Sequence, residues 1–146
     1  QNLNELAVAN LLVRRTVLIA QALADAGATF IIENPPDRGD GPLYQAKFAS
    51  HAPLWLVPEV VELVQRTGAR MITFPQCALG SKYQKWTSLL VSPELEPFLR
   101  DLGSLACQHP HGHPAVAVGA DSARAAAYPP EMPLRHIDLQ RLRGLR

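Results

Sequence analysis

Residues 28–36 read Ala-Thr-Phe-Ile-Ile-Glu-Asn-Pro-Pro, an apolar run that is stopped by two polar residues and two prolines. A short, continuous apolar run with β-branched and aromatic residues is typical of a strand buried in a parallel sheet. The prolines end the strand because proline has no N–H to donate to a neighbouring strand. The stretch therefore predicts a buried strand over residues 28–32, with Glu33 and Asn34 at its carboxyl end.

The segment before this strand predicts a long helix over residues 4–26. It contains no proline or glycine and is rich in alanine and leucine, which both favour helices. Apolar residues cover most of its circumference, so we expect the helix to be packed on more than one side. Gly27 follows directly and is well placed to end the helix.

Helices and strands continue to alternate after the first strand. The pattern predicts a second helix, a second and a third strand and a short helix, over residues 54–67, 70–74, 85–91 and 93–102. This order predicts an α/β fold, a partial doubly wound (Rossmann-like) sheet that forms about the second half of a single, incomplete domain over residues 1–146.

Irregular segments and further helical pieces complete the predicted organisation. Residues 37–53 form a loop long enough to be functional, with the character of a lid, and the His-, Gly- and Pro-rich residues 103–120 form a second irregular loop. Two last helical pieces are expected on either side of Tyr128-Pro129-Pro130.

Composition narrows the class of protein. A net charge of +1 indicates that any nucleic-acid binding depends on a local basic patch. Two cysteines are too few for a disulfide framework, which favours a reducing compartment. No uninterrupted apolar stretch reaches the roughly 18 residues of a membrane span, and no signal-peptide pattern is present. We therefore expect an intracellular protein, nuclear or cytoplasmic, that is neither secreted nor embedded in a membrane.

The end of the first strand is the strongest candidate for a site. In open α/β sheets, ligands bind at the carboxyl ends of the strands. The carboxylate of Glu33, the carboxamide of Asn34 and the rigid turn at Pro35 could together bind the hydrogen-bonding edge of a flat heterocycle. The alternative is that Glu33 and Asn34 only cap the strand and its turn.

The order of six short motifs resembles that of cytosine-5 DNA methyltransferases. The resemblance is closest to the divergent methyltransferase-like domains of phages and retroelement polyproteins, and it covers nearly the whole chain. The matching motifs are Glu33-Asn34-Pro35, Leu54-Trp55, Cys77-Ala78-Leu79-Gly80, Lys85-Trp86-Thr87, Cys107 with His109 and His113, and Tyr128-Pro129-Pro130.

The resemblance implies an S-adenosylmethionine-dependent enzyme that acts on a flipped cytosine. Glu33 matches the family's catalytic acid, which contacts the base, and Asn34 with Pro35 would hold it. Tyr128 and Pro129 match the turn that packs beside the methyl donor. The cysteine nucleophile and the glycine-rich donor loop would precede Gln1. We therefore expect that upstream sequence has been removed and that this fragment is inactive alone. Its expected partner is the missing N-terminal half of the same domain.

Basic and polar residues supply candidate contacts with DNA. Arg38 lies in the lid-like loop, and Lys82, Gln84 and Lys85 match, loosely, the family segment that grips DNA near the active site. Positive charge and hydrogen-bond donors suffice for contacts with phosphate. Asp37 and His51 in the same loop are further candidates. A solvated strand end is the alternative for the lysines.

Cysteine and histidine residues could serve as a nucleophile or as metal ligands. Cys77 follows a strand, but nothing near it in the sequence would lower its pKa, so a structural cysteine is preferred to a nucleophile. The crowded spacing of Cys107, His109, His111 and His113 is unlike usual structural zinc sites. A polar loop is therefore preferred there and no metal site is predicted, with a metal site that Cys77 completes from elsewhere in the chain as the alternative.

Three functions remain open from the sequence. The first is a cytosine-5-type DNA methyltransferase domain. The second is an amino-methyltransferase that uses Asn34-Pro35-Pro36-Asp37, a reading weakened by Asp37, which cannot stack on a base. The third is a non-catalytic module of a mobile-element polyprotein that binds nucleic acid or serves in packing.

Overall fold

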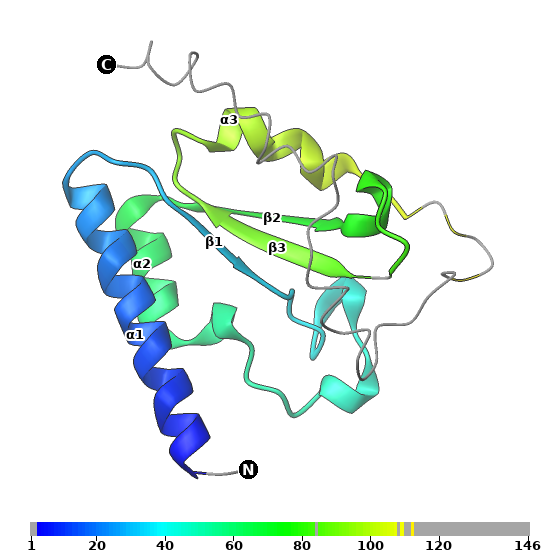
Figure 1. The fold of residues 1–146 in the computed structure, drawn as a ribbon, viewed down its shortest axis with the longest axis horizontal. Helices are drawn as coiled ribbons and strands as arrows, with labels where there is room; N and C mark the ends of the chain where they lie inside the picture. Colours follow the sequence, from blue (N-terminus) through cyan, green and yellow to red (C-terminus); the bar gives the residue numbers. More distant parts are fainter. Residues whose placement is uncertain (1–2, 84, 108, 110–111, 113–146) are drawn as a thin grey trace. The chain divides into compact units, whose positions relative to one another are not determined.

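A computed structural model describes residues 3–83, 85–107, 109 and 112 (Figure 1). This part of the chain is a mixed α/β structure with one three-stranded sheet. Its principal elements are α1 (Leu3–Asp25), β1 (Ile31–Asn34), α2 (Pro58–Thr67), β2 (Arg70–Pro75), β3 (Trp86–Val91) and α3 (Glu96–Leu99). The chain divides into two compact units, Gln1–Ile72 with Ser88–Pro97 and Thr73–Thr87 with Phe98–Arg146, and each is treated by itself below.

The sheet has the order β1-β3-β2, and β1 pairs antiparallel with β3 in a register from Ile31 opposite Val91 to Asn34 opposite Ser88. The expectation that the first strand lies in a parallel sheet is therefore wrong for the pairing that the structure describes. Residues 76–85, which join β2 to β3, are too few for the crossover of a dozen or more residues that a parallel pair needs, so a parallel arrangement is excluded for these two neighbouring strands as well.

The core of the first unit lies between the two long helices and one face of the sheet. Leu63 of α2 is 1% exposed and packs with Ala20 of α1 and Ile32 of β1. Further members of this core are Phe30, Val60, Ala69 and Leu90. Figure 1 shows α1 and α2 side by side in this unit.

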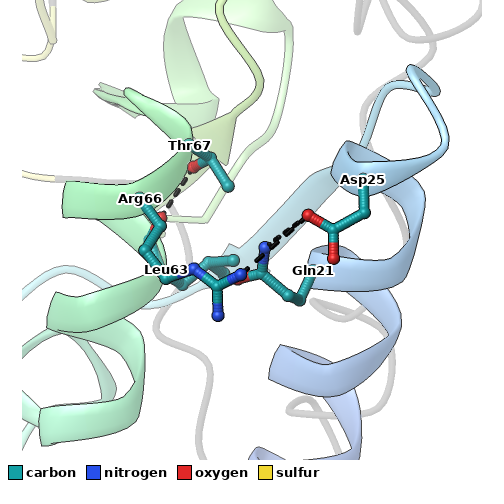
Figure 2. Close-up of polar contacts among 5 residues, drawn as sticks. All are labelled: Gln21, Asp25, Leu63, Arg66 and Thr67. Carbon is teal, nitrogen blue, oxygen red and sulfur yellow. Dashed lines mark hydrogen bonds and ion pairs between the residues drawn. The ribbon is translucent and has the colours of Figure 1, made fainter.

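Polar contacts line the exposed edge of the α1–α2 seam (Figure 2). Arg66 of α2 lies 4.0 Å from the carboxylate of Asp25, which also accepts a hydrogen bond of 3.0 Å from Gln21. Further along the seam, Arg14 Nε lies 3.3 Å from a carboxylate oxygen of Glu59. These side chains are largely exposed, so the buried apolar contacts, and not the ion pairs, hold the helices together.

The predicted bounds of α1 are confirmed, but its predicted packing is wrong. Ala20 is the one buried residue of the helix. Most of its large apolar side chains are exposed, namely Leu3, Leu6, Val8, Leu11, Leu12, Leu18, Ile19 and Leu23. Only one side of the helix meets α2 and the sheet, because the described unit has no other layer to cover the rest.

The length and apolar composition of α1 also match a membrane span. This match is weak evidence, because core helices of soluble proteins and signal sequences near the N-terminus have the same properties. The expectation of no membrane span rests on uninterrupted apolar residues alone. The mean hydropathy of α1 meets a less strict criterion, so that expectation is not tested by the structure.

The second predicted helix is shorter than expected. Leu54–Leu56 form a 3₁₀ turn, and α2 begins only at Pro58. The residue before a proline is disfavoured in helical geometry, whereas proline itself fits the first turn. Gly68 ends α2 as predicted, with a φ of 69° and its N–H donated to the Val64 carbonyl.

The remaining predicted elements appear with small differences. The second and third strands are confirmed, while the short helix expected over residues 93–102 is α3 followed by a 3₁₀ turn at Arg100–Ser104. The loop at residues 37–53 contains two 3₁₀ turns, Gly41–Leu43 and Ala46–Phe48. The helical pieces expected around Tyr128-Pro129-Pro130, and most of the 103–120 loop, lie outside the described residues.

Candidate functional site at the end of the first strand

A pocket of about 200 Å³ adjoins the carboxyl end of β1 in the first unit. Both Glu33 and Asn34, the candidate residues at this strand end, border it. Its other walls are mostly apolar and come from α1, β1, the 3₁₀ turn before α2, and α2: Leu12, Val13, Thr16, Val17, Ile32, Leu54 and Val60. An apolar hollow with a few polar groups at its rim is the usual form of a small-molecule site.

The turn after β1 is fastened by a tryptophan 20 residues further along the chain. The indole Nε1–H of Trp55 donates a hydrogen bond of 2.8 Å to the carbonyl oxygen of Pro35. Trp55 also packs against the apolar core of the unit. The structure thus joins two of the sequence motifs, Glu33-Asn34-Pro35 and Leu54-Trp55, in one site.

Strand geometry separates the side chains of the two polar residues. In the register with β3, Glu33 lies opposite Leu89 and Asn34 opposite Ser88. Successive side chains point to opposite faces of a strand, so Asn34 shares the face of the core residue Ile32 and Glu33 lies on the other face. A single flat ring could therefore contact both groups only beyond the edge of the sheet.

The lid-like loop gathers cationic side chains around one aromatic ring. The Arg38 guanidinium lies 5.7 Å and the Lys47 ammonium 4.9 Å from the centre of the Phe48 ring, and the His51 ring packs edge-on at 4.8 Å. We call Arg38, Lys47, Phe48 and His51 the loop cluster. Arg38 and His51 were predicted from the sequence and the other two were not, although the adjacent Lys47-Phe48 pair is a basic–aromatic signal.

Asp37 has a local structural role in the same loop. Its carboxylate accepts a hydrogen bond of 2.7 Å from the N–H of Gly39, an arrangement that forms a tight turn. A Cβ on Gly39 would lie 2.9 Å from the Phe48 carbonyl oxygen, so the loop closes on itself at this glycine. These contacts explain Asp37 without a role in ligand binding.

The predicted DNA-contacting lysines belong to the second unit. The Lys82 ammonium lies 5.4 Å from the centre of the Tyr83 ring. The backbone carbonyl of Lys85 accepts a hydrogen bond of 2.8 Å from the N–H of Gln76. Gln84 lies outside the described residues, as do Tyr128 and Pro129, the residues predicted beside the methyl donor.

The second unit brings Cys77 together with Cys107 and His109. One ligand atom from each lies within 4.8 Å of the others, and Cys107 Sγ is 3.8 Å from His109 Nδ1. Burial, reinforced by the neighbouring Cys107 thiol, raises the pKa of Cys77 to about 11. The Cys77 thiol is therefore protonated at neutral pH, which disfavours a nucleophilic role. His111 and His113 lie outside the described residues.

Comparisons with models of known protein families, with characterised proteins and with solved structures find no significant match to this chain. The site itself is therefore the basis for assigning a function.

Proposed function

We propose that this chain is the base-recognition part of a cytosine-5-type DNA methyltransferase domain, in which Glu33 contacts an unstacked cytosine. The observation that carries the proposal is the strand-end site itself. Glu33 and Asn34 border an apolar pocket, and the Trp55–Pro35 hydrogen bond fixes the turn that follows them. Asn34, on the face of Ile32, could meet the edge of a flat base beside the apolar wall, and Glu33, on the other face, could reach the same base beyond the edge of the sheet.

The strand-end pocket does not fit the methyl donor. The strand-end pocket of about 200 Å³ is smaller than the roughly 300–1,000 Å³ of typical pockets for small molecules and cofactors. The sequence also contains no Pro-Cys pair to supply the family's nucleophile. We therefore assign base recognition to this chain and methyl transfer only to an assembly in which another segment supplies S-adenosylmethionine binding and the nucleophile.

The loop cluster supports contact with DNA. Cationic side chains held around an aromatic ring can bind phosphate and stack on bases. The same observation favours the second candidate, a non-catalytic module that binds nucleic acid through charge alone. That module would bind DNA equally well with or without an exposed cytosine, whereas the base-recognition part would prefer the exposed base.

Two contacts weigh against an amino-methyltransferase that uses Asn34-Pro35-Pro36-Asp37. In that mechanism a proline carbonyl accepts a hydrogen bond from the exocyclic amine of the base. Here the Pro35 carbonyl accepts one from Trp55, and Asp37, in place of an aromatic residue, accepts one from Gly39.

Removal of charge from the loop cluster tests the interaction with DNA. The double substitution Arg38→Ala with Lys47→Ala is expected to weaken binding of a short DNA duplex and to reduce the salt dependence of log K by about 1 for each phosphate that the variant no longer neutralises. Fluorescence anisotropy over a salt series measures both quantities. The matched control is Arg15→Ala, which removes an exposed charge from α1. A salt dependence that is equal in the double variant and the wild-type chain would remove the loop cluster from the interface.

A further inference from the structure

We propose that Cys77, Cys107 and His109 form a binding site for a divalent cation of the zinc class. The three residues lie in the second unit, and two chain segments bring them together: the turn after β2 supplies Cys77, and the segment after the 3₁₀ turn Arg100–Ser104 supplies the other two. The strand-end site does not involve them. This proposal is therefore independent of the proposed function.

The first segment presents its sulfur from a tight turn. Cys77 lies in the 3₁₀ turn Gln76–Leu79, which ends at Gly80 with a φ of 87°, a conformation that favours glycine. Gly80 donates its N–H to the Cys77 carbonyl at 3.2 Å. At the other end of the turn, Gln76 donates its N–H to the Lys85 carbonyl at 2.8 Å, which ties the turn to the segment leading into β3. A sulfur held in this way is positioned before any ion arrives.

The distances suit a tetrahedral ion. With Zn–S of about 2.3 Å and Zn–N of about 2.0–2.1 Å, ligand atoms in a tetrahedral site are separated by about 3.6–3.8 Å. The Cys107 Sγ–His109 Nδ1 distance of 3.8 Å already matches. The widest pair in the cluster lies within 4.8 Å, so a contraction of about 1 Å completes the geometry. Three protein ligands leave the fourth position for water or another donor.

The ligand types favour zinc over harder cations. Two cysteine sulfurs and an imidazole select zinc and related ions, which displace the thiol protons on binding, whereas magnesium and calcium take oxygen ligands. Neither cysteine is in a disulfide. The crowded spacing of Cys107, His109, His111 and His113 argued against a site made by these four residues alone, whereas here Cys77 supplies a ligand from another segment.

Cobalt substitution tests the proposal on the intact chain. The reduced, metal-free protein is titrated with Co²⁺ and then with Zn²⁺, and absorption is recorded. We expect a thiolate-to-cobalt charge-transfer band that saturates at one Co²⁺ per chain and disappears when Zn²⁺ displaces the cobalt. Absence of this band in the wild-type chain would overturn the proposal, whatever the stability of the variants.

Single substitutions assign the ligands. Cys77→Ser, Cys107→Ser and His109→Ala are each expected to lower the affinity for Co²⁺ by on the order of 100-fold or more, since even loss of a group that only orients a ligand costs 10–100-fold. His51→Ala, in the first unit, is the matched histidine control and is expected to retain full affinity. Retention of wild-type affinity by the Cys77 variant, or loss of binding in the His51 variant, would contradict the assignment.

Discussion

Replacement of Leu63 by alanine is expected to lower the free energy of unfolding by about 3 kcal/mol. Leu63 is 1% exposed and lies in the core that joins α1, α2 and the sheet. Truncation removes its apolar contacts and leaves a cavity that the surrounding helices can close only in part. The 2.7 Å hydrogen bond from the Thr67 hydroxyl to the Leu63 carbonyl survives, because it involves the backbone of Leu63.

The ion pairs on the same seam provide the control for Leu63. Arg14→Ala and Arg66→Ala each break one pair whose side chains are 40–68% exposed, and exposed pairs contribute roughly 0–1 kcal/mol. Urea unfolding followed by circular dichroism measures the stability of each variant. A loss of stability in the Arg variants equal to that in the Leu63 variant would show that charge, and not apolar burial, holds α1 on α2.

Trp55→Ala is expected to lower the free energy of unfolding by about 2 kcal/mol and to release the turn after β1. The indole N–H bond to the Pro35 carbonyl contributes about 1 kcal/mol. The apolar contacts of the half-buried ring with the core supply the remainder. Since these contacts hold the Asn34-Pro35 turn, faster hydrogen exchange is expected in the N–H groups of Asp37 to Gly39.

Trp55→Phe separates the two contributions, because it keeps an aromatic ring and removes only the N–H donor. We expect it to lose about 1 kcal/mol and to accelerate the same exchange to a smaller extent. Circular dichroism during urea unfolding measures both variants without depending on tryptophan fluorescence. If Trp55→Phe were as stable as wild type and equally protected, the hydrogen bond to Pro35 would not hold the turn.

Local sequence was sufficient for several elements. The absence of proline and glycine from a segment rich in alanine and leucine predicted α1 closely, and Gly68 marked the end of α2. The apolar run after Gly27 predicted a strand over residues 28–32, whereas β1 is Ile31–Asn34, so Glu33 and Asn34 lie within the strand and the prolines after Asn34 mark its end. In each case the signal lies within a few residues of the feature that it determines.

Features that depend on contacts between distant segments could not be predicted in this way. The Trp55–Pro35 hydrogen bond joins residues 20 positions apart, and Cys77 meets Cys107 and His109 across 30 positions or more. The antiparallel pairing of β1 with β3 joins distant segments, with Ile31 opposite Val91, and no local signal in either strand sets its direction. The apolar side chains of α1 are exposed because only one side of the helix is covered by other elements. The spacing of apolar residues within the helix does not show which elements will cover it.

The most direct test of the central claim, that Glu33 contacts an unstacked cytosine, is a comparison of two DNA duplexes by fluorescence anisotropy. One carries a cytosine opposite an abasic position, and the other carries thymine there, because an unpaired base leaves the stack at little cost. Wild-type chain is expected to bind the cytosine duplex roughly tenfold more tightly, the effect of one hydrogen bond to a charged group. Glu33→Ala should abolish this preference, whereas the matched control Glu62→Ala should retain it. Equal binding of both duplexes by the wild-type chain, or an undiminished cytosine preference in the Glu33 variant, would contradict the claim.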